Sequence, residues 1–255
     1  MSFDATEAFP LDDLAPRNAA VFLDFDGVLV DLAVTPDAVV VTKKLTSMLD
    51  SLERATGGAC AIVSGRSVED LRRHLPAAPR TVIGSHGAER DLPGVPTRHH
   101  AIIGSPKVAR LHERAARAGD LDGVLVERKP TGVALHYRTN PDHGPAIRAF
   151  ANTLMAEFSG FATLPAKAAI ELRPADIGKD IAIAEAMALP DFAGRVPVYF
   201  GDDTTDEPAL AWVTEQDGIA VKVGPGESIA RHRLDQPSDV MAALTGWIES
   251  ERGAR

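Results

Sequence analysis

Cysteine is almost absent from this chain of 255 residues, which contains only Cys60. A single cysteine excludes an intramolecular disulfide and any zinc site built from several thiolates. Cys60 lies in the apolar run "ACAIVSG", which favours a buried thiol over a nucleophile. Because the chain builds nothing from oxidised cysteine, we expect it to work in the reducing cytoplasm.

The chain also lacks an excess of basic residues, since Lys and Arg total 27 against 36 for Asp and Glu, for a net charge of −9. Phosphate backbones and anionic membranes attract a basic face, so we expect neither nucleic acid nor a membrane surface as a partner. A small phosphorylated substrate is still compatible with this charge, because a few local cations are enough to hold it. A monomer is the expected form.

Long apolar runs are missing as well. No stretch approaches the roughly 20 residues of a membrane span. The acidic start "MSFDATEAFPLDDL" has neither the basic nor the apolar region of a secretory signal. The length and the 45% hydrophobic content instead fit one large or two modest globular domains.

What the chain does contain is an alternation of short apolar strands and helices. Residues 19–25, 59–65 and 80–87 predict buried strands without a period of two, as in a parallel sheet. A helix is predicted over residues 35–56, with Thr35 as its N-cap and Pro36 at its first position. This alternation is typical of an α/β fold.

A different pattern begins after residue 95. It predicts helices over residues 105–119 and 143–160, a hairpin over residues 123–138 and a further strand pair over residues 161–174. The parallel pattern resumes from Ile177, with strands at 196–203 and 218–224. We therefore predict a Rossmann-like, doubly wound core formed by residues 1–95 and 174–255, interrupted by an inserted α+β cap, residues 96–173.

Polar residues follow the predicted core strands at their carboxyl ends, where open α/β sheets carry their active sites. The set at these ends is Asp24, Asp26, Ser64, Gly65, Arg66, Ser85, His86, Gly87, Gly201, Asp202, Asp203 and Asp206. Lys179 begins the helix that precedes the strand at 196–203. The topology therefore gathers several carboxylates, a serine and a lysine on one rim.

Several carboxylates crowded on one rim repel each other and favour a bound cation. Oxygen ligands without His or Cys indicate a hard ion, for which Mg²⁺ is the usual choice. A carboxylate can also act as a nucleophile, while a lysine and a hydroxyl suit a phosphate. Taken alone, the pair Asp24 and Asp26 is equally compatible with a solvated strand end.

Four motifs in order, "DFDGVL", "VSGR", "GKD" and "GDDTTDE", resemble those of the haloacid dehalogenase (HAD) superfamily of phosphotransferases. The resemblance implies that Asp24 takes up the phosphoryl group and that Asp26 acts first as general acid and then as general base. Ser64 and Lys179 would hold the phosphate.

The same resemblance implies a Mg²⁺ site. Asp24, the main-chain carbonyl of Asp26, and Asp202 would bind the ion, with Asp203 or Asp206 close behind.

A narrower resemblance covers nearly the whole chain, from about Val21 to about Val223. "IGSHGAE", "ERKPTGVALHYR", "KAAIELRP" and "GDDTTDEPAL" are similar to the trehalose-6-phosphate phosphatase family. The family implies a C2-type cap, a small-molecule sugar phosphate as the partner, and hydrolysis of trehalose 6-phosphate through an aspartyl-phosphate intermediate. The residues implied in substrate binding are Gly65, Arg66, His86, Glu127, Lys129, Arg138, Lys167, Glu171 and Glu207.

Several alternatives stay open. His86 is equally compatible with a loop histidine that satisfies backbone groups, and Glu127 and Lys129, two apart on a strand, with a solvated strand face. The core motifs also fit a phosphatase for another sugar phosphate, such as sucrose 6-phosphate or a mannosyl-linked phosphate. In a different class, a non-catalytic phospho-accepting or regulatory module shares the sheet, carboxylates and lysine. The insertion and the intact set of motifs argue against that module.

Overall fold

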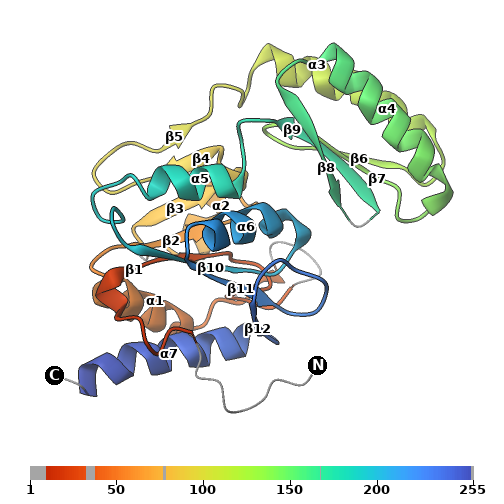
Figure 1. The fold of residues 1–255 in the computed structure, drawn as a ribbon. Helices are drawn as coiled ribbons and strands as arrows, with labels where there is room; N and C mark the ends of the chain where they lie inside the picture. Colours follow the sequence, from red (N-terminus) through yellow and green to blue (C-terminus); the bar gives the residue numbers. More distant parts are fainter. Residues whose placement is uncertain (1–9, 33–37, 77–78, 167, 254–255) are drawn as a thin grey trace. The chain divides into compact units, whose positions relative to one another are not determined.

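The computed structural model describes residues 10–32, 38–76, 79–166 and 168–253. The chain divides into two compact units (Figure 1). The first, which we call the core unit, consists of Met1–Thr97 and Lys179–Arg255, and the second, the cap, of Arg98–Gly178.

The larger sheet has eight strands in the order β12-β11-β10-β1-β2-β3-β4-β5; all belong to the core unit except β5, which is formed by the first two residues of the second unit. Its strands are β1 (Ala19–Leu23), β2 (Cys60–Val63), β3 (Thr81–Gly84), β4 (Glu89–Asp91), β5 (Arg98–His99), β10 (Val196–Gly201), β11 (Ile219–Val223) and β12 (His232–Leu234). The pairs from β12 to β3 are parallel, and β4 pairs with β3 in the antiparallel sense. The mainly parallel sheet predicted from the apolar runs is confirmed.

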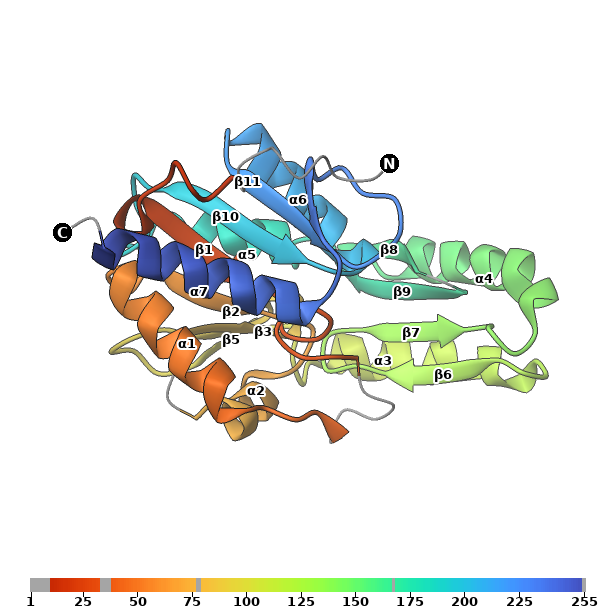
Figure 2. The same cartoon turned by 90° about the horizontal axis from the view of Figure 1, so that it is seen from below.

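Helices cover both faces of this sheet (Figures 1 and 2). They are α1 (Lys43–Ala55), α2 (Val68–His74), α5 (Lys179–Ala186), α6 (Glu207–Glu215) and α7 (Pro237–Gly253). Successive side chains of a strand point to opposite faces. Leu23 therefore packs with α1, α2 and α7 in one apolar cluster, while Phe22 packs with α5 and α6 in another.

The register of the central strands positions the site. Leu23 at the end of β1 lies opposite Phe200 of β10 and Ile62 of β2. Because all three strands run in the same direction, the residues that follow them emerge at one edge of the sheet. This edge, which we call the rim, carries Asp24, Ser64 and Asp202.

The cap contains an antiparallel sheet of order β6-β7-β9-β8. Its elements are β6 (Leu125–Arg128), β7 (Val133–His136), β8 (Phe161–Ala166), β9 (Ala169–Pro174), α3 (Pro106–Ala115) and α4 (Gly144–Glu157). Leu135 and Leu172 pack with Leu111 of α3 and Ile147 of α4 in a third apolar cluster. The two helices cover one face of the sheet, and strand alternation places Ala134 and its neighbours on the other, which we call the open face. The predicted insertion of an α+β cap into an α/β core is confirmed.

The start of the first long helix was predicted wrongly. Thr35 and Pro36 lie outside the described residues, but residues 39–42 are not helical and α1 begins at Lys43. The Thr42 hydroxyl accepts a hydrogen bond from Leu45 N and caps the helix. Three valines precede this cap, and β-branched side chains lose rotamer freedom in a helix, which explains the later start. The short strands β4, β5 and β12 were not predicted.

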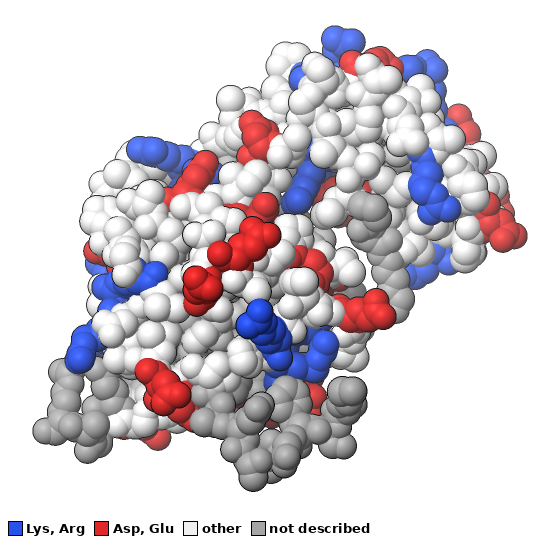
Figure 3. All heavy atoms as spheres, viewed as in Figure 1, with Lys and Arg blue, Asp and Glu red and all other residues white. Residues whose placement is uncertain are grey.

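The surface agrees with the acidic composition. On the face shown in Figure 3, Lys and Arg side chains are scattered among acidic and uncharged residues and form no continuous basic band. Within the described ranges, no helix combines the length and apolar character that crossing a bilayer requires.

Candidate active site

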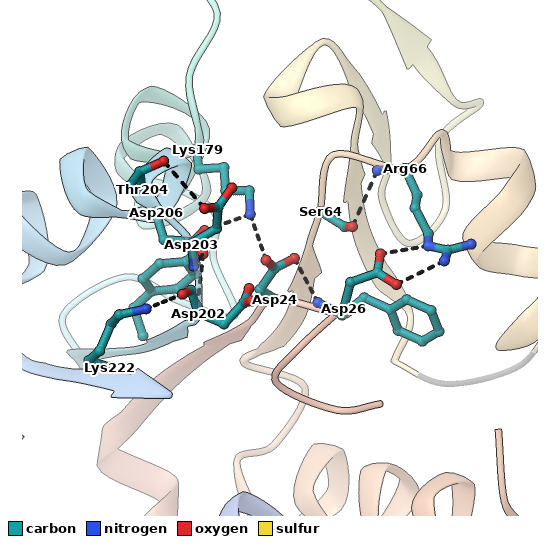
Figure 4. Close-up of polar contacts among 12 residues, drawn as sticks. Asp24, Asp26, Ser64, Arg66, Lys179, Asp202, Asp203, Thr204, Asp206 and Lys222 are labelled. Carbon is teal, nitrogen blue, oxygen red and sulfur yellow. Dashed lines mark hydrogen bonds and ion pairs between the residues drawn. The ribbon is translucent and has the colours of Figure 1, made fainter. Parts of the chain in front are cut away.

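Asp24 forms the centre of the rim (Figure 4). It follows β1, is 5% exposed, and its main-chain N–H donates to the Phe200 carbonyl of β10 at 3.0 Å. One carboxylate oxygen accepts from Phe25 N at 2.7 Å, and the other lies 2.8 Å from the Lys179 ammonium. The carboxylate is thus held from two sides in a nearly dry environment.

Lys179, the first residue of α5, bridges two buried carboxylates. Its Nζ donates to Asp24 at 2.8 Å and to Asp206 at 2.6 Å. Burial by itself lowers the pKa of Lys179, but Asp206 and Asp24 outweigh it and raise the pKa above the usual value. The lysine is therefore a permanent cation, which suits it to balance a phosphate.

Asp206 is saturated with hydrogen bonds. One oxygen accepts from Lys179 and from the Tyr199 hydroxyl at 2.5 Å, and the other accepts from the main-chain N–H of Asp202 and Asp203 at 2.9 and 3.0 Å. Burial opposes its charge, but these donors, Lys179 first, lower the pKa of Asp206. Four accepted bonds use both oxygens, so this side chain orients Lys179 and the loop after β10.

Asp202 approaches the loop after β1 very closely. A Cβ at Gly27 would lie 2.2 Å from the Asp202 carboxylate, so only glycine fits there, and its φ of +72° also favours glycine. Burial, with repulsion from Asp206, raises the pKa of Asp202 to about 6. The buried Lys222 of β11 donates to the Asp202 carbonyl and fixes the main chain at this point.

The residues on the rim fit a divalent cation. Among the described residues, Asp24, Asp202 and Asp206 each place a carboxylate oxygen within 4.8 Å of the others. Because both Asp206 oxygens already accept hydrogen bonds, Asp24 and Asp202 are the carboxylates better placed to bind an ion, and the ligand role predicted for Asp206 stays a prediction. Burial first, and neighbouring carboxylates after it, also raise the pKa of Asp24, against the opposing effect of Lys179. A cation would relieve this penalty on Asp24 and Asp202, and a set of oxygen donors selects a hard ion.

The side chains of Asp26 and Asp203 stand apart from this cluster. Both oxygens of Asp26 bind the Arg66 guanidinium, at 2.6 and 2.8 Å. Asp203 is exposed and forms a capping box with Asp206 at the start of the turn Thr204–Asp206. The roles predicted for these two residues toward the ion stay predictions.

The loop after β2 is tied to the loop after β3. Ser64 is buried, its hydroxyl oxygen accepts from Arg66 N at 3.2 Å, and its carbonyl accepts from His86 N at 2.9 Å. The His86 ring lies against the loop so closely that a Cβ on Gly65 would be 2.7 Å from it. Glu89, which is 7% exposed, accepts from Val68 N at 2.6 Å and thereby fixes the start of α2.

In the cap, three of the predicted binding residues, Glu127, Lys129 and Glu171, lie on the open face of the sheet. Glu127 and Glu171 both lie opposite Ala134, so the three form one row across β6, β7 and β9. Lys129 donates to the buried Glu171 at 2.7 Å, and His136 contacts Glu127 at 2.8 Å. The open face thus presents one ion pair, between Lys129 and Glu171, and one contact between a histidine and a carboxylate.

Three other predicted residues are placed differently. The expectation that Arg138 lies on the hairpin strand was wrong, because β7 ends at His136 and Arg138 is exposed in the following turn, at the opposite end of the hairpin from Lys129. Lys167 lies outside the described residues. Glu207 begins α6 and accepts from Ile229 N at 2.9 Å, while its buried Oε1 has no hydrogen-bond partner within the described ranges.

Several residues of the site were missed. A tyrosine and a lysine inside apolar strands, Tyr199 and Lys222, are signals that could have been used, since buried polar ends require partners. Glu89 stands in the quoted motif "IGSHGAE" without having been assigned a role. His136 is two residues from Ala134 on the same strand, so alternation alone places it on the face of Glu127.

The mainly parallel core sheet with a four-stranded antiparallel insertion is the fold of a solved phosphatase of the HAD superfamily from Bacteroides thetaiotaomicron, which superposes with a TM-score of 0.65 at 17% identity, covering 95% of this chain and 99% of that one. The model of the trehalose-phosphatase family matches residues 22–239, and the chain belongs to this family. It is therefore a phosphoric monoester hydrolase by family.

Individual proteins agree with this assignment. The chain is 38% identical over 210 residues to a probable trehalose-phosphate phosphatase from Sinorhizobium fredii, covering 82% of this chain and 78% of the relative. It is 35% identical over 248 residues to the trehalose-6-phosphate phosphatase of Escherichia coli, covering 94% and 90%. The crystal structure of a trehalose-6-phosphate phosphatase related protein superposes with a TM-score of 0.71 at 26% identity, covering 92% and 99%.

Proposed function

We propose that this protein hydrolyses trehalose 6-phosphate to trehalose and phosphate, as a Mg²⁺-dependent monomer in the cytoplasm. Residues 1–95 and 174–255 would carry the chemistry, and residues 96–173 would select the sugar. The observation that carries the proposal is the buried Asp24 carboxylate, 2.8 Å from the Lys179 ammonium, in a chain of the trehalose-phosphatase family.

In the first half of the reaction, an Asp24 oxygen attacks the phosphorus in line with the sugar oxygen. The new bond joins Asp24 to phosphorus, and the bond from phosphorus to the sugar oxygen breaks. Asp26 donates a proton to that oxygen, which leaves as a neutral hydroxyl group. The product still bound is an aspartyl phosphate.

In the second half, Asp26 removes a proton from a water molecule. The water oxygen attacks the phosphorus of the aspartyl phosphate, the bond to Asp24 breaks, and inorganic phosphate leaves. Asp26 ends the cycle with the proton that the next sugar oxygen requires, so one side chain serves both halves.

Charge neutralisation carries much of the catalysis in phosphoryl transfer. Lys179 lies beside the nucleophile and offers its charge to the phosphoryl oxygens, and the buried Ser64 hydroxyl can donate to them. Asp24, Asp202 and the Asp26 carbonyl would hold Mg²⁺, whose chemistry when bound is further neutralisation of the transferring group.

Sugar selection is proposed to reside in the cap. Hydroxyl groups are bound by side chains with fixed donors and acceptors, and the pairs of Lys129 with Glu171 and of His136 with Glu127 supply both kinds on the open face. Arg138 and Lys167 are proposed to add contacts to the distal sugar. His86 and Glu207 are proposed to contact the substrate from the core unit.

The test is phosphate release from trehalose 6-phosphate beside sucrose 6-phosphate, a mannosyl-linked phosphate and glucose 6-phosphate, each with Mg²⁺ and with EDTA. We expect trehalose 6-phosphate to give the highest kcat/KM and EDTA to abolish release. Preference for another sugar phosphate would reassign the substrate. Binding without phosphate release would instead favour a non-catalytic module.

A further inference from the structure

Arg66 directs its side chain at Asp26 and not into open space (Figure 4). Its Nε lies 2.6 Å from one Asp26 oxygen and its Nη2 lies 2.8 Å from the other. This is the two-point geometry that only arginine can offer to a carboxylate. The arginine side chain is 11% exposed and the Asp26 side chain 30% exposed, so the aspartate is the more solvated partner.

Arg66 is itself fixed from two other directions. Its Nη1 donates to Asp70, one helical turn further along, at 2.7 Å. Its guanidinium carbon lies 5.3 Å from the centre of the Phe25 ring, within the range of a cation–π contact. The guanidinium would have to break these contacts before it could turn toward a ligand.

We infer that Arg66 is a positioning residue for Asp26 and not a contact for the substrate. The inference rests on the proposed function, in which Asp26 is the general acid and base. A carboxylate has about four lone-pair positions, and the guanidinium takes one on each oxygen. The clamp therefore fixes the plane of the Asp26 carboxyl group and leaves its outer edge for exchanging a proton with the sugar oxygen and with water.

Arg66 as a positioning residue for Asp26 and Arg66 as a substrate contact predict different rates for substrates with different leaving groups. A sugar oxygen is a poor leaving group and needs the proton of Asp26, whereas 4-nitrophenolate leaves without one. Hydrolysis of the aspartyl phosphate needs Asp26 with either substrate. If Asp26 is misplaced, both steps should therefore slow with trehalose 6-phosphate. With 4-nitrophenyl phosphate, the first step, which releases nitrophenolate, should keep its rate, and only the hydrolysis of the aspartyl phosphate should slow.

The experiment compares Arg66→Met and Arg66→Lys with wild type in the full-length enzyme with Mg²⁺. We expect kcat on trehalose 6-phosphate to fall at least tenfold in both, within the ~10²–10⁴ that a positioned acid or base contributes. With 4-nitrophenyl phosphate, stopped-flow should show a rapid burst of about one equivalent of nitrophenolate followed by slow turnover. The inhibition constant of inorganic phosphate should stay within about twofold of the wild-type value.

A direct contact between Arg66 and the phosphoryl group would give a different result. Arg66→Met would then weaken phosphate inhibition at least tenfold and slow the burst, and Arg66→Lys would restore both, because a lysine can balance a phosphate. Either of those results overturns the inference. Lack of turnover of trehalose 6-phosphate by wild type would instead overturn the proposed function.

Two further variants separate positioning from a general loss of structure. Asp70→Asn removes the partner that holds Arg66 from behind, and we expect the same burst with a smaller fall in kcat. Arg54→Met removes an exposed arginine of α1 whose side chain hydrogen-bonds Ser51 of the same helix, and we expect wild-type kinetics. Thermal melts of each variant exclude unfolding as the cause, and a burst absent from both Arg66 variants while they remain folded would contradict the inference.

Discussion

The rim of the core unit and the open face of the cap hold their polar residues in opposite ways. On the rim, Lys179 is 2% exposed and Asp206 is fully buried, so their charges face each other without water. On the open face, the side chains of Glu127 and His136 are 49% and 37% exposed, whereas the Glu171 side chain is buried. Desolvated charges are preorganised for chemistry, while solvated ones keep the freedom to bind a ligand. The rim should therefore matter for every substrate and the cap for the sugar alone.

The largest effect is expected at the nucleophile. Asp24→Asn keeps the size of the side chain but removes the charge that attacks phosphorus, so turnover should fall by on the order of 10⁴-fold or more on sugar and aryl phosphates alike. Phosphate release measures the loss of turnover, and a thermal melt measures whether the fold is retained. Retained turnover of either ester would contradict the expectation that the rim is required for every substrate while the cap matters for the sugar alone.

The next effect concerns the stability of the rim. Lys179→Met leaves Asp24 and Asp206 buried without their shared cation, and breaking a buried pair of this kind costs about 3–5 kcal/mol of unfolding free energy. Urea unfolding in EDTA measures this loss. The double variant Lys179→Met with Asp206→Asn should regain part of the stability and none of the activity. An unchanged urea midpoint for Lys179→Met would mean that water reaches these charges.

In the cap, the expected effect falls on one class of substrate. Lys129→Ala removes a charged hydrogen-bond donor from the open face, so kcat/KM for trehalose 6-phosphate should fall about 10²-fold, equivalent to roughly 2.7 kcal/mol. The kcat/KM for 4-nitrophenyl phosphate should stay within about twofold of the wild-type value. Arg128→Ala is the matched control, because Arg128 is the exposed last residue of β6, directly before Lys129, and alternation places its side chain on the opposite side of the strand. Equal losses on both substrates would show that Lys129 acts on structure.

The rim was more predictable from the sequence than the cap, for a topological reason. Parallel strands with apolar runs must end at one edge, so Asp24, Ser64 and Asp202 could be grouped before any contact was known. In the cap, Arg138 was placed on a strand because β7 ends at His136, whereas the turn signal in the sequence, the pair Asn140 and Pro141, comes only several residues later. Local signals set such boundaries weakly.

Side-chain partners were the least predictable feature in both units. Arg66 and Asp26 are 40 positions apart, and their pairing depends on how two loops direct their side chains once the sheet has formed. The motif "VSGR" drew attention to Arg66, but nothing in the sequence indicated that Asp26 is a partner of its side chain. Similarly, two of the four hydrogen bonds that Asp206 accepts come from Tyr199 and Lys179, which meet from two different elements, and no spacing in the sequence expresses that meeting.

The smallest expected effect is the pH dependence of the rim without metal. The pKa of Asp202 is about 6 in the folded protein, against ~3.9 in an unfolded chain. Between these values the folded state keeps a proton that the unfolded state releases, so the unfolding free energy should fall as pH rises from about 4 to 6, by on the order of 1 kcal/mol after solvent screening. Burial also raises the pKa of Asp24, so Asp24 acts in the same direction.

Urea unfolding in EDTA at a series of pH values measures this dependence. The slope of the unfolding free energy against pH should be shallower for Asp202→Asn than for wild type. Added Mg²⁺ at pH 7 should stabilise wild type more than the variant, because the ion favours the charged carboxylate. Identical slopes would mean that Asp202 is as well solvated as the side chains on the open face, and that burial does not distinguish the two regions at this position.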